Sequence, residues 1–147
     1  MGAHPYYYFV RYQEDADKAL QELRQREFAA GRYNPVMPFL DFPVAANSPA
    51  PGAQHDSIEE AMEASDADGT RSILDLLTVG DEPNFCVACR LPDERLLNLF
   101  GTTEPTREKI EQSMEFFEDL ERGHGICTIA YKNGKPDELF FAGYSFD

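Results

Sequence analysis

Three cysteines and one histidine are the residues whose types and spacing could support metal or thiol chemistry. Cys86 and Cys89 form a C-x-x-C pair, and His124 and Cys127 form an H-x-x-C pair further along the chain. Such paired spacings occur in zinc sites. Cys86 and Cys89, however, fall in a segment that we expect to be a strand, where residues three apart point to opposite faces. We therefore expect buried, reduced thiols with no metal and no cofactor, and the four residues are kept only as the alternative.

His124 is the candidate for acid–base chemistry, because it stands between two glycines where a helix should give way to a strand. Such a turn can expose an imidazole as a general base. A small enzyme or ligand-binding domain would use His124 in this way, with Arg71, Asp75 and Asp68 as the nearest polar candidates. The alternative is a solvated histidine at a helix C-terminus. The sequence contains no phosphate-binding loop, dinucleotide fingerprint or H-E-x-x-H motif.

Residues 32–56 form a long segment with no periodicity and five prolines. Connections of this length are usually binding loops, lids or disordered. The first half interleaves prolines with large apolar residues, namely Val36, Met37, Phe39, Leu40, Phe42 and Val44. These side chains either run across the sheet and enter the core, or offer an apolar patch to a partner, or cover a pocket lined by Tyr and Phe. The second half, residues 45–54, is small and polar, and we expect it to be a flexible tether.

The chain is strongly acidic, with a net charge of −14 over 147 residues. Nucleic acids and anionic membranes are themselves polyanions, so this charge argues against both as partners. Residues 104–121 carry seven Asp and Glu side chains against Arg107 and Lys109. They form either a solvated helix face or a surface that attracts a basic protein.

Local patterns predict the elements that position these residues. The segment 6–12 alternates as a strand, with Tyr6, Tyr8, Val10 and Tyr12 on one face. Residues 14–30 have helical periodicity and end at Gly31. Ser57 and Glu60 form a capping box that begins a second helix, which ends near Ser65.

The second half of the chain predicts two hairpins separated by helices. Residues 71–79 and 85–91 form two apolar runs joined by a loop of hairpin length. Two helices follow, over residues 93–100 and 104–122. The dipeptide Asn133-Gly134 is typical of a type I′ turn between strands 125–131 and 137–146. Counted from a two-residue loop, Ile126 should face Phe141 and Cys127 should face Phe140.

These elements predict one domain spanning residues 1–147, of the α+β class. The expected order is β-α-loop-α-β-β-α-α-β-β, with a mostly antiparallel sheet of about five strands and helices packed on it. The N-terminus has no secretory pattern, no apolar run could span a bilayer, and the cysteine count is odd, so we expect a cytoplasmic protein.

The functional hypothesis is a non-catalytic protein-interaction module of the adaptor or toxin-neutralising type, with a protein partner or self-association. The expected contact residues are Val36, Met37, Phe39, Leu40 and Phe42. The alternative is the small enzyme described above, with an aromatic pocket gated by residues 32–56 and catalytic residues His124, Arg71 and Asp75.

Overall fold

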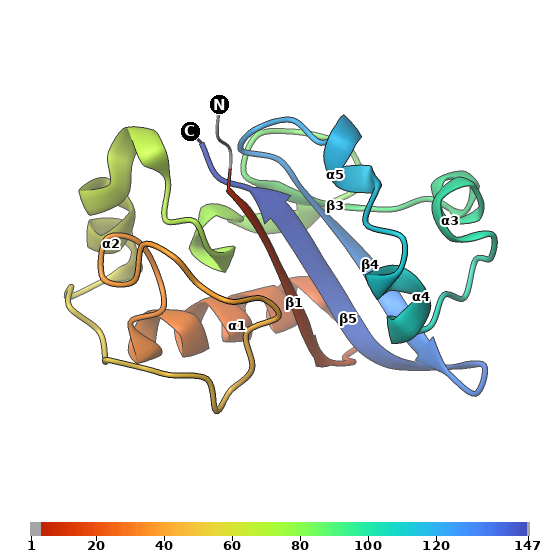
Figure 1. The fold of residues 1–147 in the computed structure, drawn as a ribbon, viewed down its shortest axis with the longest axis horizontal. Helices are drawn as coiled ribbons and strands as arrows, with labels where there is room; N and C mark the ends of the chain where they lie inside the picture. The colour runs from red at the N-terminus through yellow and green to blue at the C-terminus, as the bar shows by residue number, and fades with distance from the viewer. Residues whose placement is uncertain (1–3, 147) are drawn as a thin grey trace.

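Five strands form one mixed sheet in the order β1-β5-β4-β3-β2, as the computed structural model describes for residues 4–146 (Figure 1). The strands are β1 (Pro5–Arg11), β2 (Thr78–Gly80), β3 (Val87–Arg90), β4 (Gly125–Lys132) and β5 (Lys135–Tyr144). The helices are α1 (Ala16–Ala30), α2 (Ile58–Ser65), α3 (Asp93–Phe100), α4 (Arg107–Glu111) and α5 (Phe116–Asp119). The α+β class and the five-stranded sheet are confirmed.

The expectation of a mostly antiparallel sheet is wrong. β1 and β4 both pair with β5 antiparallel, but β3 pairs with β4 and with β2 in parallel. Between β3 and β4 the chain passes through α3, α4 and α5, and a crossover of this kind returns the next strand in the same direction. The predicted hairpin between residues 71–79 and 85–91 is also absent, because β2 and β3, which lie in these two runs, are parallel. Because β2 has only three residues, a short connection is enough to bring the chain back beside it.

Two further predictions, a strand over residues 71–79 and a single helix over residues 104–122, hold only in part. Residues 71–79 are mostly not a strand, since a 3₁₀ turn occupies Ile73–Asp75 before the short β2. The single helix expected over residues 104–122 is divided into α4 and α5. Glu111 lies four residues before Glu115, which lies four before Asp119, and like charges at this spacing destabilise a continuous helix.

The hairpin of β4 and β5 turns at Asn133-Gly134, where both residues have positive φ, as predicted. Its register differs by one residue from the expected one, because Cys127 lies opposite Phe141 and Ile126 opposite Ala142. The pairing shifts between Ala130 and Tyr131, where β5 carries one extra residue next to Pro136. Proline has no N–H to donate, so the ladder accommodates it with a bulge.

Helix ends follow the predicted local chemistry. Asp15 accepts a hydrogen bond from the Lys18 amide at 3.0 Å at the start of α1, which ends at Gly31. Ser57 accepts from the Glu60 amide at 3.1 Å, and the Glu60 carboxylate accepts from the Asp56 amide at 3.2 Å. The N-cap at Ser57 is therefore confirmed, and Glu60 reaches back as predicted, but to the amide of the residue before the cap rather than to that of Ser57.

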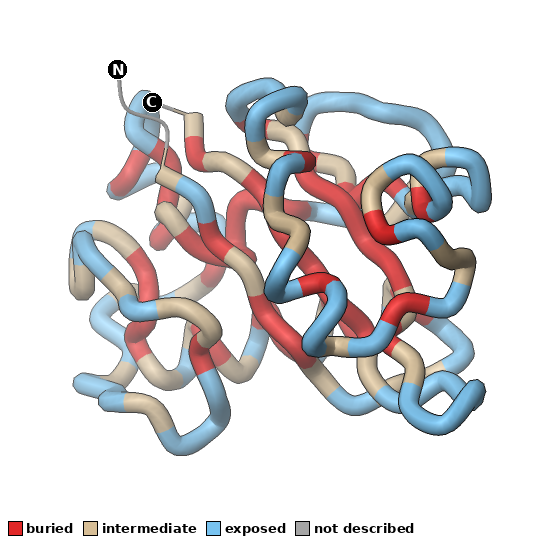
Figure 2. Tube along the Cα trace, turned by 45° about the vertical axis from the view of Figure 1, so that its right-hand side comes forward, coloured by how far each residue is buried: buried red, intermediate tan, exposed pale blue. Residues whose placement is uncertain are grey.

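The sheet is covered on both faces (Figures 1 and 2). On the α1 side the core contains Tyr6, Tyr8, Leu20, Leu23 and Phe141, and on the side of α3, α4 and α5 it contains Phe9, Phe100, Ile110, Phe116 and Phe140. The predicted alternation of β1 is thus confirmed. A third cluster joins residues 32–56 to α2 through Tyr33, Ile58, Ala61 and Leu74.

The outer edge of β2 is occupied by side chains of α1. The Asp17 carboxylate accepts hydrogen bonds from the Val79 amide and the Thr78 hydroxyl, both at 3.0 Å. The Gln21 amide donates to the Leu77 carbonyl at 2.8 Å.

Among residues 4–146, no helix is long and apolar enough to cross a membrane.

Candidate functional site

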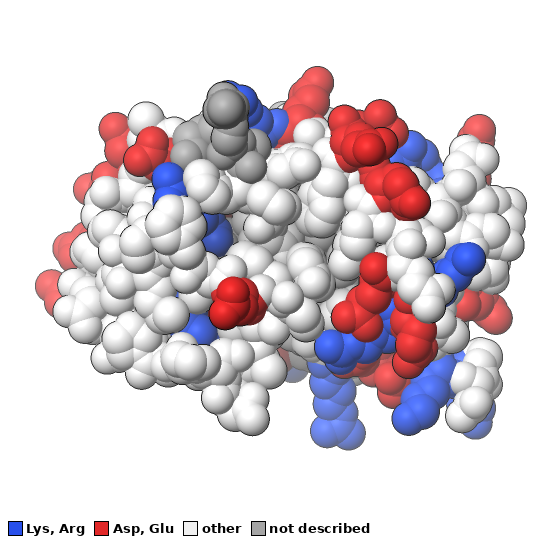
Figure 3. Space-filling model, viewed as in Figure 1, with Lys and Arg blue, Asp and Glu red and all other residues white. Residues whose placement is uncertain are grey.

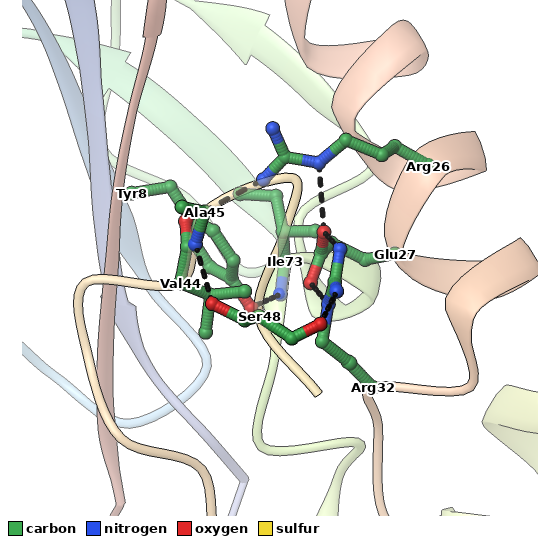
Figure 4. A network of polar contacts seen from close by, with 8 residues as sticks. All are labelled: Tyr8, Arg26, Glu27, Arg32, Val44, Ala45, Ser48 and Ile73. Carbon is green, nitrogen blue, oxygen red and sulfur yellow. Dashed lines mark hydrogen bonds and ion pairs between the residues drawn. The ribbon is translucent and has the colours of Figure 1, made fainter. Parts of the chain in front are cut away.

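A buried ion pair fixes the start of the 32–56 segment to α1 (Figure 4). The Arg32 guanidinium donates to both carboxylate oxygens of Glu27, at 2.8 and 2.7 Å, and both side chains are almost completely buried. Arg32 also donates to the Ser48 carbonyl at 2.8 Å, and Arg26 donates to Glu27 at 2.8 Å. One pair of charges therefore connects the end of α1 to the middle of the segment.

The expectation that residues 45–54 are a flexible tether does not fit the structure. The Gly52 and Ala53 amides donate to the Ala30 and Ala29 carbonyls, at 2.8 and 3.1 Å. Gly31 lies so close that a Cβ atom there would be 2.1 Å from the Gly52 oxygen. The small residues here allow the backbone of the segment to lie close to the end of α1, and they do not indicate flexibility.

Most of the large apolar residues in the first half of the segment pack inward. Val44 is buried, and Leu40 and Phe42 pack against the core on the α1 side. Phe42 contacts the rings of Tyr7 and Tyr8, which lie on opposite faces of β1, and the Tyr7 hydroxyl donates to the Phe42 carbonyl at 3.2 Å. The segment therefore covers the outer edge of β1.

The other two predicted contact residues, Val36 and Met37, are also partly buried. Val36 packs against the third cluster, and Met37 is half-buried. The Met37 amide donates to the Tyr33 carbonyl at 2.8 Å, which holds this turn of the segment in place.

Phe39 is the exception, since its side chain is 75 % exposed. The Arg71 guanidinium carbon lies 5.5 Å from the centre of the Phe39 ring, and Arg71 donates to the Pro38 carbonyl at 3.4 Å. The His4 ring lies 6.0 Å from the same ring. A hollow of about 290 Å³ opens beside Phe39 and is lined by His4, Pro5, Pro38, Phe39, Leu40, Phe42 and Arg71. We call these residues the Phe39 surface.

The Phe39 surface brings together residues that the sequence assigned to two different hypotheses. Phe39, Leu40 and Phe42 were expected to bind a partner, whereas Arg71 was expected near a catalytic base. No sequence pattern singles out His4. Its place in the hollow depends on the pairing of β1 with β5, where the His4 amide donates to the Ser145 hydroxyl at 3.0 Å.

The segment that carries Phe39 has few charged residues, in contrast to the rest of the chain. From Tyr33 to His55 the only Asp, Glu, Lys or Arg is Asp41, although such residues make up 27 % of the chain. Figure 3 shows this side as largely uncharged, while acidic side chains gather over α4 and α5. Depletion of charge around an exposed aromatic ring is typical of the centre of a protein interface.

His124 lies in a different hollow from Arg71. Its Nε2 is 3.4 Å from a Glu121 carboxylate oxygen, and its side chain is 20 % exposed. It lines a groove of about 510 Å³ between α3 and α5, with Cys89 and Ile126 among the lining residues. None of residues 32–56 lines this groove, so the predicted base and the predicted gate lie apart.

Asp75 is fully buried, and Asp68 is exposed in the 3₁₀ turn after α2. Both Asp75 carboxylate oxygens accept from the Thr70 amide, at 2.9 and 3.1 Å. Burial raises the pKa of Asp75 to about 6, against the opposing effect of the hydrogen bonds from Thr70. Asp75 therefore fixes the turn that precedes Arg71, and the candidate polar groups are not gathered around His124.

The cysteines are free and buried, as expected. Cys127 packs into the core on the α1 side, whereas Cys89 lines the groove on the opposite side. Among the residues that the structure describes, no three His, Cys, Asp or Glu side chains could hold a metal ion together. Burial raises the pKa of Cys86 to about 11 and that of Cys127 to about 12, and it also raises the pKa of Cys89.

Thiol titration checks this description of the cysteines. At pH 8 we expect Cys86 and Cys127 in the native protein to react with an aromatic disulfide at least ~100-fold more slowly than in the urea-unfolded protein, because thiolate is the reacting form. Cys89 should be the fastest of the three, since it lines a groove. Rapid native reaction of Cys127 would contradict the described packing.

No protein-family model, no curated protein and no solved structure matches this chain.

Proposed function

We propose that this protein is a non-catalytic protein-interaction module whose partner docks on the Phe39 surface. The observation that carries the proposal is a largely exposed phenylalanine beside an apolar hollow, on a side of the molecule that has almost no charge. Such a module could serve as an adaptor or as a neutralising partner of another protein.

The composition of the Phe39 surface supports this proposal. Full burial of a phenylalanine side chain contributes about 1.5–3 kcal/mol. Aromatic residues and arginine are enriched at the centres of interfaces, where a few residues provide most of the binding free energy. Phe39 and Arg71 are in contact here, and Asp41 is the one Asp, Glu, Lys or Arg residue in the segment from Tyr33 to His55.

The anchoring of the segment also supports binding. The Glu27–Arg32 pair and the backbone hydrogen bonds of Gly52 and Ala53 fix residues 32–56 to α1 at the start and near the end of the segment. A surface that is already ordered loses less conformational entropy when a partner binds. This favours a docking surface over a lid that has to open.

The test is a substitution at Phe39 with a matched control. We expect Phe39→Asp to weaken partner binding at least about tenfold, because a carboxylate replaces the ring that the partner should bury. Leu97→Asp in α3 is the control, since Leu97 is also exposed, at 52 %, and lies outside the Phe39 surface.

The measurement begins with capture from an extract of the producing cells, using wild type and both variants side by side. A protein retained by wild type and Leu97→Asp, but not by Phe39→Asp, is then purified, and its Kd is measured for all three. Equal affinity for wild type and Phe39→Asp would overturn the proposal.

A further inference from the structure

We infer that the Phe39 surface binds a second copy of this chain, in a two-fold contact where each Phe39 ring enters the hollow of the other copy. This inference rests on the proposed function, because it uses the same surface.

The shape of the surface is complementary to itself. A two-fold contact joins the same patch of both copies, so each projecting group needs a recess on that same patch. Phe39 provides the projecting ring, and the hollow beside it has a volume of about 290 Å³. A cavity of about 150 Å³ holds a benzene molecule. One phenyl ring from the second copy therefore fits, and both rings are buried in a single contact.

The charges of the surface are complementary to themselves in the same way. Asp41 is exposed between two members of the Phe39 surface, and Arg71 lies against the Phe39 ring. The Arg71 guanidinium thus lies within the Phe39 surface, and the Asp41 carboxylate lies beside it, outside the residues that line the hollow. In a two-fold contact, the Asp41 of each copy faces the Arg71 of the other, and the two pairs are equivalent.

The net charge of −14 favours this side of the molecule for self-association. Two copies that approach through the acidic sides, over α4 and α5, bring many like charges together, which opposes association. Residues 33–55 carry one acidic side chain, so two copies can meet here with little local repulsion. A basic partner would instead be attracted to the acidic side (Figure 3).

Sedimentation equilibrium of the purified full-length chain, from micromolar to hundreds of micromolar concentration, tests the inference directly. We expect a reversible dimer whose association constant rises with sodium chloride concentration, because salt screens the repulsion between two acidic chains. Binding of a basic partner has the opposite salt dependence. Phe39→Asp should lower the association constant at least about tenfold, and Leu97→Asp should leave it unchanged.

A charge-exchange experiment tests the two-fold geometry. Asp41→Arg alone and Arg71→Asp alone should each weaken self-association, because like charges then face each other twice. An equimolar mixture of the two variants should recover association, since opposite charges face each other again at both positions. Circular dichroism and thermal unfolding of each variant confirm that it is folded.

The outcomes separate this inference from the proposed function. A wild-type chain that stays monomeric at every concentration and salt overturns the second copy as partner. If another protein is then retained through Phe39, the proposed function stands. A dimer that persists in Phe39→Asp, or a mixture of charge variants that stays monomeric, overturns the two-fold contact described here.

Discussion

Glu27→Ala is expected to lower the free energy of unfolding by about 3–5 kcal/mol, the usual cost of removing one partner of a buried ion pair. The Arg32 guanidinium would keep its hydrogen bond to the Ser48 carbonyl, but it would lose the carboxylate that neutralises it in the interior. The cost arises from the remaining buried charge, rather than from the lost attraction alone.

Urea denaturation of wild type and Glu27→Ala measures this difference. Asp81→Ala provides the control, because the Arg90–Asp81 pair is exposed, and pairs of that kind contribute at most about 1 kcal/mol. Replacing Glu27 and Arg32 together by methionine should be less damaging than Glu27→Ala, since no charge then stays buried. Equal losses for Glu27→Ala and Asp81→Ala would show that the Glu27–Arg32 pair is hydrated in solution.

The second large effect expected is a pH dependence of stability that comes from Asp75. Its pKa is about 6 in the folded protein, whereas an unfolded aspartate has a pKa near 3.9. A group whose pKa is raised by folding contributes stability below its unfolded pKa, and that contribution is lost as the pH rises through the folded value. The full shift corresponds to about 3 kcal/mol, at roughly 1.4 kcal/mol per pKa unit. Because the unfolded aspartate is already half ionised at pH 4, we expect a loss of about 2 kcal/mol between pH 4 and pH 7.

Because other carboxylates titrate in the same range, the informative quantity is the difference between wild type and Asp75→Asn. The free energy of unfolding of wild type minus that of the variant should fall as the pH rises, since only wild type can lose a proton at this position. A difference that stays constant from pH 4 to pH 7 would mean that Asp75 is not buried as described.

The parts of the fold that depend only on residues close together in the sequence could be predicted from it. The alternation of β1, the N-cap at Ser57, the end of α1 at Gly31 and the turn at Asn133-Gly134 are all local. The parallel pairing of β2 with β3 could not be predicted, because a short connection between two apolar runs normally indicates a hairpin.

The buried ion pair did leave a signal in the sequence. The apolar stripe of the first predicted helix passes through Leu20 and Leu23 and continues at Ala30, so helical spacing requires a buried residue near position 27. A glutamate stands there, and a buried glutamate needs a partner. Its partner, Arg32, lies just beyond the helix. The exposure of Phe39 left no such signal, since its neighbours Leu40 and Phe42 have the same apolar pattern and pack inward.

The side chains that occupy the outer edge of β2 leave fewer of its backbone groups open to strands of other molecules. An open edge offers unpaired amide and carbonyl groups on which strands of other molecules can assemble into fibrils. Asp17 and Gln21 already bind the Val79 amide and the Leu77 carbonyl at that edge, and Phe42 packs against the edge at the other end of the sheet. The same segment that carries Phe39 thus also covers one of the two sheet edges on which other strands could assemble.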